Sequence, residues 1–396
     1  MALCICAVHL SACAARSYQY DDSDIVTLTQ RAEAQTYRNV TVSATVPSAA
    51  EAENIFGLPL YDKGVQPVWL EIVNNSPVVV RLAPVGIDND YFSPLEVSYV
   101  SRRGYSKEAR AAMDQRFHES GIERWIQPGA TESGFVFTHL VKGTKSFNVD
   151  LFGGGDSHHY TFFVDVPGYV PSHSEVNFAE LYDENERRMV NQSGLRQYLE
   201  SLPCCSSNAA GSGTGQLLNV ALIGNGKEIL QALLRANWYE VSADDVRESN
   251  SQPYFLFGRK PDAVLRIQRG NSTDRNEMLL WMAPVRADDK AVWVGHITNF
   301  VGKRRYIQQV LELANRSPDV DDARNFLLQN LWYAQSLRQY AWMDSEIRVP
   351  VDNPRTDFNG ESWFTNGVRL VAWLSAEPVS LTSTRLIPWD KQVRIQ

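Results

Sequence analysis

The spacing of apolar residues changes between the two halves of this 396-residue chain. In residues 40–46 apolar and polar side chains alternate, which is typical of a strand that buries one face. Residues 217–223 form an apolar run interrupted only by Asn219, and apolar residues at helical spacing then lead to Trp238. One hydrophobic core rarely grows beyond about 250 to 300 residues. The change of pattern therefore predicts two domains with different folds.

The first domain is predicted to be an antiparallel β-sandwich with a helical insertion, over residues 37–170. Its other strand patterns lie at residues 68–73, 78–82, 134–141, 146–152 and 160–166. The Asn-Asn-Ser-Pro sequence at 74–77 predicts that the first two of these strands form a hairpin. Ser106 is a favourable N-cap residue, so we expect the inserted helix to run from there to Glu119.

The second domain is predicted to be an α+β domain with a mostly antiparallel sheet, over residues 216–396, with its helices on one side. Its strand patterns lie at residues 217–223, 254–259, 263–269, 278–283, 292–299 and 368–374. A helix is expected to begin at Pro318 with Ser317 as its N-cap. Residues 171–215 are predicted to form a helical connector and linker, and the small, polar and glycine residues at 203–216 predict the division between the domains.

The apolar N-terminus, residues 1–15, is shorter than the roughly 20 residues that a membrane-spanning helix needs. Within it, the sequence Leu-Ser-Ala-Cys at 10–13 resembles the lipobox of a bacterial lipoprotein signal peptide. The resemblance implies a signal peptide over residues 1–12 and a palmitate-containing lipid anchor on Cys13. It also implies that Ala14 permits sorting to the outer membrane, so that the protein faces the periplasm.

One feature departs from the lipoprotein pattern, because no Lys or Arg precedes the apolar run. We therefore expect that the true start lies upstream, and the alternative is an apolar N-terminus with a chance cysteine. Residues 13–36 are polar after the lipobox and are predicted to be a spacer between the anchor and the first domain.

The charge of the chain bears on its partners. It carries 38 Lys and Arg against 46 Asp and Glu, which leaves a formal net charge of -8. Because binding to a phosphate backbone depends on clustered basic side chains, we expect no nucleic-acid partner. The partners that we expect are the membrane, through the N-terminal lipid, and a protein of the cell envelope.

Cys204 and Cys205 are adjacent and would be the remaining cysteines after processing at Cys13. Ordinary disulfide geometry requires Cα atoms farther apart, so the pair is predicted to be two structural thiols, with a vicinal redox pair or a metal site as the alternatives. His158 and His159 are adjacent on an expected strand and point to opposite faces. The sequence predicts no metal and no cofactor.

Several short motifs of the second domain occur in a characteristic order. They contain Gly258, Arg259, Asp262, Arg275, Trp281, Trp293, Gly295 and His296, which we take as the candidate site residues. In this order the motifs resemble the C-terminal domain of LssY proteins, over about residues 203–343, and the first domain resembles a partner found beside it in envelope proteins. The family's activity is undefined. The phosphatase that accompanies the domain in its namesake has a Ser-Gly-His element with no match here, so the resemblance implies no lipid phosphatase.

Each candidate has a structural and a functional interpretation. Arg259 and Asp262 flank Lys260-Pro261 and are predicted to stabilise a hairpin turn, although Arg259 and Arg275 could instead hold an anionic ligand. Trp281 and Trp293 are predicted to form a cross-strand pair in the core, with a glycan or lipid groove as the alternative.

The sequence contains no Gly-x-Ser-x-Gly elbow and no recognisable set of acid, base and nucleophile. We therefore predict no catalytic residues and do not expect an enzyme. The predicted function is that of a cell-envelope lipoprotein acting as a non-catalytic binding or structural module. The alternative is an envelope hydrolase that acts on a lipid or glycan.

Overall fold

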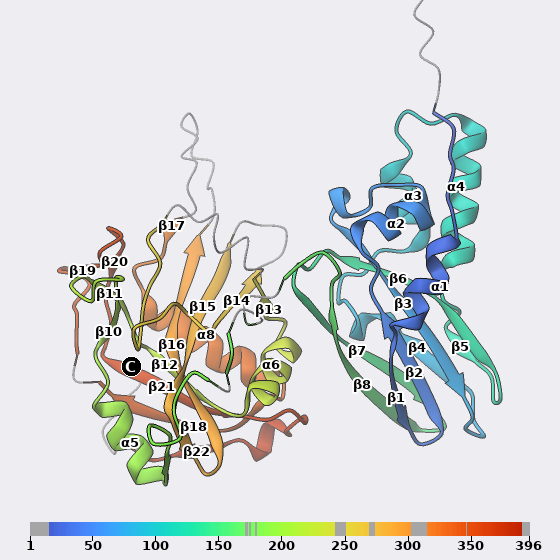
Figure 1. The fold of residues 1–396 in the computed structure, drawn as a ribbon. Coiled ribbons are helices and arrows are strands. Elements are labelled where there is room, and N and C mark those ends of the chain that lie inside the picture. Colours follow the sequence, from blue (N-terminus) through green and yellow to red (C-terminus); the bar gives the residue numbers. More distant parts are fainter. Residues whose placement is uncertain are drawn as a thin grey trace, which may run out of the picture. The chain divides into compact units, whose positions relative to one another are not determined.

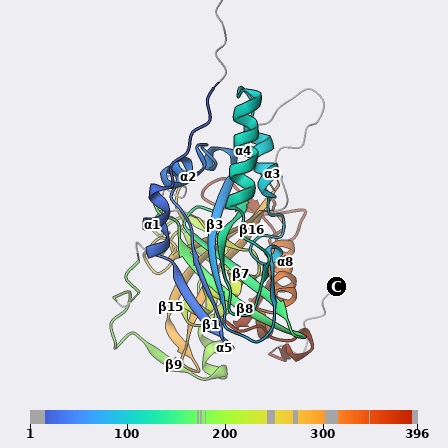
Figure 2. The same cartoon turned by 90° about the vertical axis from the view of Figure 1, so that its right-hand side faces the viewer.

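The computed structural model describes residues 16–170, 173, 176–178, 180–241, 251–268, 274–301, 315–345 and 347–389. The predicted signal peptide and Cys13 lie outside the described residues. The chain divides into two compact units, the first formed by Met1–Leu140 with Asn148–Gly168 and the second by Val141–Phe147 with Tyr169–Gln396. Figures 1 and 2 show the elements of both units, and each unit is described by itself.

The first unit is a sandwich of two four-stranded sheets. One sheet has the order β1 (Glu33–Tyr37), β2 (Val40–Thr45), β3 (Val65–Asn74), β6 (Thr131–His139), and its pairings are antiparallel. The other has the order β5 (Trp125–Ile126), β4 (Val80–Ala83), β7 (Thr144–Gly153), β8 (Asp156–Asp165). The predicted β-sandwich with a helical insertion is confirmed.

Helices cover one end of the first sheet. They are α1 (Ser23–Gln30), α2 (Ala49–Phe56), α3 (Pro94–Ser101) and α4 (Lys107–Ser120), with short 3-10 turns η1 (Tyr61–Lys63) and η2 (Pro84–Gly86). The Ser106 side chain accepts a hydrogen bond from the Ala109 amide and so caps α4 as predicted. Phe56 of α2 and Phe117 of α4 stack at 5.1 Å and pack with Phe137 of β6, which joins the helices to the sheet.

Two sequence expectations for the first unit differ from the structure. β3 and β4 lie in different sheets, so the predicted hairpin at 74–77 is wrong. The Asn74 side chain donates to the carbonyls of Val78 and Ile126 at 2.8 and 3.0 Å, and this holds the chain as it crosses to the second sheet. Part of the predicted spacer is folded too, because Leu28 of α1 is fully buried and β1 pairs with β2.

The second unit is built on one large sheet with the order β13-β14-β15-β16-β12-β21-β18-β22, and β9 and β17 pair with β15 and β16. Its strands are β9 (Arg188–Val190), β12 (Val220–Ile223), β13 (Tyr239–Glu240), β14 (Ala263–Gln268), β15 (Arg275–Ala287), β16 (Lys290–Val301), β17 (Asn315–Arg316), β18 (Leu337–Asp344), β21 (Val368–Leu374) and β22 (Arg385–Ile387). Most pairings are antiparallel, whereas β12 with β21, β9 with β15 and β18 with β22 are parallel. The predicted α+β domain is confirmed.

Helices cover both faces of this sheet (Figure 1). α6 (Gly226–Arg235) and α8 (Val320–Tyr333) pack Leu233 and Leu327 on one face. α5 (Gln192–Glu200) packs Leu195 and Leu199 on the other face, so the expectation of helices on a single side holds for α6 and α8 only. Two short ribbons and a 3-10 turn complete the unit: β10 (Cys205–Ser207) with β11 (Thr214–Leu217), β19 (Arg355–Thr356) with β20 (Ser362–Trp363), and η4 (Leu381–Ser383).

Three further local expectations differ. The predicted linker at 203–216 contains the β10–β11 ribbon, because Cys205 pairs with Leu217. The predicted strand at 254–259 is a tight turn, in which Leu256 and Arg259 exchange two backbone hydrogen bonds. The N-cap of α8 is Asp319, whose side chain accepts from two amides of the first turn, and not Ser317.

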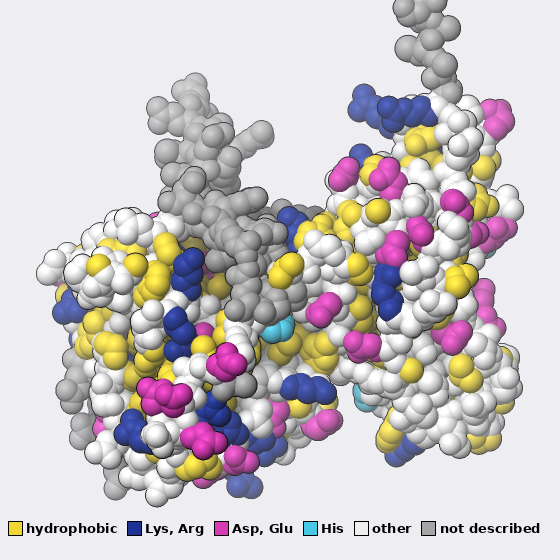
Figure 3. Space-filling model, in the orientation of Figure 1, with side chains coloured by type: hydrophobic (Ala, Val, Ile, Leu, Met, Phe, Trp, Pro, Cys, Tyr) yellow, Lys and Arg dark blue, Asp and Glu magenta, His cyan; other side chains and the backbone are white. Residues whose placement is uncertain are grey.

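Figure 3 shows one face of the molecule, where acidic and basic side chains are interspersed on the surface of the second unit. No helix in the described ranges is long and apolar enough to cross a membrane.

Candidate functional site

Arg259 and Asp262 form a closed ion pair. The Arg259 guanidinium donates twice to the Asp262 carboxylate, both at 2.8 Å, and also to the Tyr182 hydroxyl at 2.9 Å and the Met282 carbonyl at 2.7 Å. Asp262 is 1 % exposed and also accepts from the Met282 amide at 2.7 Å. The pair therefore fastens the turn to β15, and every oxygen of the carboxylate already has a donor.

The turn itself lies three residues earlier than the sequence predicts. Phe257 and Gly258 have φ values of 55° and 75°, so the chain reverses at these two residues and not at Lys260-Pro261. Glycine is favoured in that left-handed region, which explains Gly258 in the motif. The motif is a turn anchored by an ion pair.

Trp281 and Trp293 do not face one another. Trp281 pairs with Val294 and Met282 with Trp293, so the two indoles lie on opposite faces of the sheet and the predicted cross-strand pair is wrong. Both are buried in apolar clusters. Packing explains why residue 295 is a glycine, because a Cβ there would lie 1.9 Å from the Leu279 carbonyl oxygen.

His296 is the most unusual of the candidates. It is fully buried between Tyr254 and Trp281, with ring centroids at 5.1 and 5.8 Å, and no residue that the structure describes hydrogen-bonds either ring nitrogen. Burial, together with the nearby Arg316 cation, lowers the pKa of His296 to about 3. The imidazole is therefore neutral at physiological pH, and no acid orients it as a catalytic base requires.

A polar network adjoins His296. The Tyr254 hydroxyl donates to Asp357 Oδ2 at 2.7 Å and accepts from Arg316 at 2.5 Å, while Gln216 donates to the same carboxylate oxygen at 2.7 Å. Burial raises the pKa of Tyr254 to about 12, so its hydroxyl stays protonated. The residues of this network are far apart in sequence, and sequence reasoning missed all of them but His296.

The charged candidates do not meet in one cleft. Arg275 begins β15, where its guanidinium lies 4.3 Å above the Phe300 ring and 3.9 Å from Glu277. The Asp262 amide bonds the Leu280 carbonyl, five residues further along the same strand, which is about 16 Å away. Arg259 and Arg275 therefore do not hold one ligand together.

An open cleft lies elsewhere in the unit, beside the end of α5. It has a volume of about 350 Å³, and Arg196, Glu200, Cys204, Asp344 and Arg369 are among its lining residues. Arg369 is 2 % exposed and donates to the Leu218 carbonyl at 2.7 Å and the Leu199 carbonyl at 2.6 Å. Burial lowers the pKa of Arg369 to about 10, which leaves it charged.

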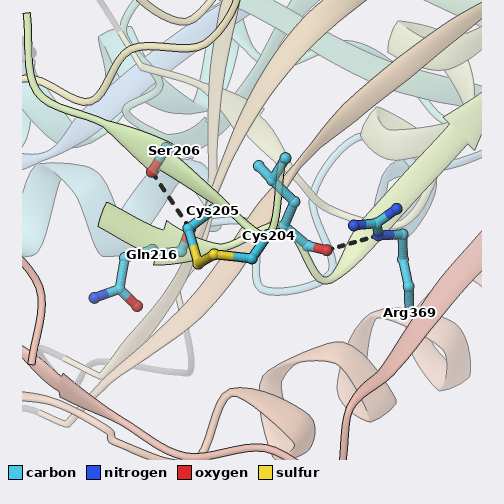
Figure 4. The surroundings of a disulfide bond; sticks show 6 residues. Cys204, Cys205, Ser206, Gln216 and Arg369 are labelled. Atoms are coloured by element: carbon cyan, nitrogen blue, oxygen red, sulfur yellow. Dashed lines mark hydrogen bonds between the residues drawn. A yellow bond between two sulfur atoms is a disulfide. The ribbon is translucent and has the colours of Figure 1, made fainter. Parts of the chain in front are cut away.

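Cys204 and Cys205 form a disulfide beside this cleft, and the expectation of two structural thiols is wrong (Figure 4). Their Cα atoms are 3.7 Å apart, which is the ordinary spacing of neighbouring residues across a trans peptide bond, and the disulfide closes a small ring that includes this bond. Leu218 lies between the disulfide and Arg369: its amide donates to the Cys204 carbonyl and its carbonyl accepts from the guanidinium.

Three side chains of the first unit are arranged so that they could take part in catalysis. Ser157 Oγ lies 3.0 Å from His159 Nε2, and His159 Nδ1 lies 2.7 Å from Asp150 Oδ1. The three side chains stand on β7 and β8, and His159 is exposed. The separate histidine, His158, is buried on the opposite side of the strand, as the alternation of side chains predicts.

Within the described ranges no cluster of His, Cys, Asp and Glu could hold a metal.

Comparison with known proteins gives one family. Residues 196–368, a little under half of the chain, match the family described as LssY C-terminus. All the candidate residues from Gly258 to His296 lie inside this match, and so do Cys204 and Cys205. No curated protein matches the chain.

Proposed function

We propose that the chain is a lipid-anchored envelope protein that binds an anionic ligand without converting it chemically. The second unit contains an LssY C-terminus domain, and this domain includes the Arg259 turn and most of the cleft. The ligand site is the cleft beside α5. The lipid on Cys13 would hold this site at the outer membrane, facing the periplasm, within reach of an envelope protein partner.

The buried cation Arg369 carries this proposal. Three other buried or half-buried arginines of the unit each have a carboxylate partner, namely Arg259 with Asp262, Arg316 with Asp357 and Arg324 with Asp321. Among the described residues, Arg369 has backbone carbonyls as its hydrogen-bond acceptors and no carboxylate. A buried charge is costly unless it is paired, so an anion that enters the cleft would complete the site.

The other polar groups of the cleft favour binding over catalysis. Glu200 bonds Arg196 at 2.8 Å, and Ser345 donates to the Gly367 carbonyl at 2.7 Å. Histidine is absent from the described residues that line the cleft. The Ser345 hydroxyl therefore has no imidazole base among the described residues of the cleft.

Phosphate provides the test of binding. We expect inorganic phosphate to raise the Tm of the full chain, relative to chloride at equal ionic strength, because a ligand that binds the folded state stabilises it. Arg196→Gln should weaken phosphate binding about fivefold by removing one of the two cations of the cleft. Arg385→Gln, at an exposed arginine of β22, is the matched control and should change nothing. Equal Tm values in phosphate and chloride would refute the anion site.

The anchor is tested separately. Replacing Cys13 with Ala should move the protein from the membrane fraction to the soluble fraction, since no helix of the described chain could span a membrane in its place. Retention of the variant on membranes after a carbonate wash would contradict lipid anchoring at Cys13.

The Ser157, His159 and Asp150 relay favours a second function, that of an ester hydrolase. The order of the groups is that of a serine hydrolase, with a nucleophile, a base and an orienting acid. A p-nitrophenyl ester assay and labelling of Ser157 by a fluorophosphonate test it. Hydrolysis that is lost in Ser157→Ala and retained in Ser133→Ala would establish this function, and absence of labelling would exclude it.

A further inference from the structure

The pairing of Cys204 with Cys205 is difficult to explain as a structural crosslink. A disulfide stabilises a protein mainly by closing a loop of the unfolded chain, and the effect grows with the length of the loop. These two cysteines are one position apart, so their bond closes essentially no loop. The bond therefore contributes little to stability, and its position has to be explained in another way.

The two sulfur atoms have different surroundings. Cys204 is half-buried and lines the open cleft. Cys205 is 6 % exposed and packs in an apolar cluster with Val320, Val349 and Trp363. A reagent that enters through the cleft therefore meets Cys204 first.

The cleft also supplies positive charge beside Cys204. The Cys204 carbonyl accepts from the Leu218 amide at 2.9 Å, and the Leu218 carbonyl accepts from Arg369 at 2.7 Å, so two hydrogen bonds link the cysteine to the buried cation. Arg196 lines the same cleft. Thiolates are the attacking species in disulfide exchange, and nearby cations favour their approach.

We propose that the Cys204–Cys205 disulfide is a thiol–disulfide exchange site whose substrate is a dithiol that enters through the cleft. The proposal goes beyond ligand binding by giving the cleft a redox chemistry. It rests on the proposed function in one respect, because the preference for an anionic thiol depends on the anion-binding cleft.

The exchange proceeds in two balanced steps. A thiolate of the dithiol attacks Cys204 Sγ and breaks the bond to Cys205 Sγ, and the Cys205 thiolate takes a proton because its apolar surroundings disfavour charge. The second thiolate of the reagent then attacks the reagent sulfur that is bound to Cys204, and Cys204 leaves and takes the second proton. Two electrons pass to the cysteine pair, and the dithiol, which has lost two protons, departs as a cyclic disulfide.

Timed alkylation of the folded full chain tests the exchange. The chain is incubated with dithiothreitol, quenched with acid and alkylated, and peptide mapping separates the 204–205 peptide from Cys4, Cys6 and Cys13. We expect reduction at a rate proportional to dithiothreitol concentration, with a change in Tm of less than about 2 °C. Reduction that requires urea, at a rate independent of the reductant, would overturn the proposal.

Single variants test the predicted asymmetry of the two sulfurs. In Cys205→Ser the remaining thiol faces the cleft and should react with an aromatic disulfide reagent at least about tenfold faster than the buried thiol of Cys204→Ser. Each variant serves as the control of the other. Equal or reversed rates would overturn the assignment of Cys204 as the attacked atom.

A charge comparison separates this proposal from the proposed function. Mercaptoethanesulfonate is anionic and cysteamine is cationic, and we expect the anionic thiol to react faster after correction for thiol pKa, with a smaller advantage in Arg196→Gln. If the two thiols react equally while dithiothreitol reduces the pair, the exchange site stands and the anion-binding cleft is wrong. If the folded chain resists dithiothreitol, the exchange site is wrong whatever the phosphate titration gives.

Discussion

The Arg259 turn and the Arg369 cleft use the same guanidinium group in opposite ways. Arg259 donates hydrogen bonds to a carboxylate, a hydroxyl and a carbonyl. Asp262 is enclosed, and both of its carboxylate oxygens accept hydrogen bonds. Arg369 holds two carbonyls beside an open cleft and has no carboxylate among the described residues. Partnered charge within a turn indicates a fixed structural role, whereas buried charge without a counter-ion beside a cleft indicates a place for one.

The largest effect expected from this comparison is at Asp262. Asp262→Ala leaves the Arg259 guanidinium and the Met282 amide without their main acceptor, which costs about 3 to 5 kcal/mol for a buried pair. Tm should fall by roughly 6 to 20 °C. The measurement is thermal melting of the full chain, monitored by tryptophan fluorescence.

Arg259→Ala should also lower Tm by several degrees, because it leaves the enclosed Asp262 carboxylate without its cation. Lys260→Ala, at the exposed neighbour, is the control. Unchanged melting in Asp262→Ala together with lost phosphate binding would move the ligand site to this turn.

His296 sharpens the comparison because it is enclosed like Asp262 and, like Arg369, has no ion-pair partner among the described residues. Its pKa of about 3 when folded lies below the usual value of about 6.5, so the unfolded chain binds the proton more readily between these two pH values. Stability is therefore lost as pH falls through this window, by about 2 kcal/mol at pH 5.

The measurement is urea unfolding of the chain and of His296→Phe at pH 7 and pH 5. The variant should match or exceed the parent at pH 7, since it removes an unpaired polar group, and should gain about 2 kcal/mol on it at pH 5. The carboxylates contribute equally to both chains and cancel. Parallel pH dependence of the two would mean that His296 is not held neutral by the fold.

The smallest effect is expected at Arg369. Arg369→Met loses two hydrogen bonds but also removes an uncompensated charge, so the loss should be about 1 kcal/mol, or roughly 2 to 4 °C in Tm. The rise in Tm caused by phosphate should disappear in this variant and persist in Arg259→Ala. If phosphate still stabilises Arg369→Met, the contrast between the two arginines carries no functional meaning.

The sequence revealed the first of these regions and not the second, for a physical reason. Arg259 and Asp262 are three positions apart, so their pairing can be inferred from local chemistry. Arg369 is 151 and 170 positions from Leu218 and Leu199, and its partners are backbone carbonyls, which have no residue signature. The signal that was available is a lone arginine within the apolar run of residues 368–374.

The same distinction holds for the fold. Strands with period-2 alternation and the cap of α4 were predictable because their signals are local. The placement of β3 and β4 in different sheets was not predictable, because a turn sequence such as that at 74–77 is compatible with a hairpin and with a crossover between sheets. The network around His296 depends on Tyr254, Arg316 and Asp357, which only the folded sheet brings together.

The position of β21 in the sheet has a consequence for synthesis of the chain. β21 lies between β12 and β18 and is the last of the three to leave the ribosome, so the central sheet cannot close until residue 374 is made. Until then β12 and β18 expose unpaired edges that can recruit other nascent chains. A fragment cut where the family match ends, at residue 368, would keep this defect permanently, and fragments meant to fold should extend beyond Leu374.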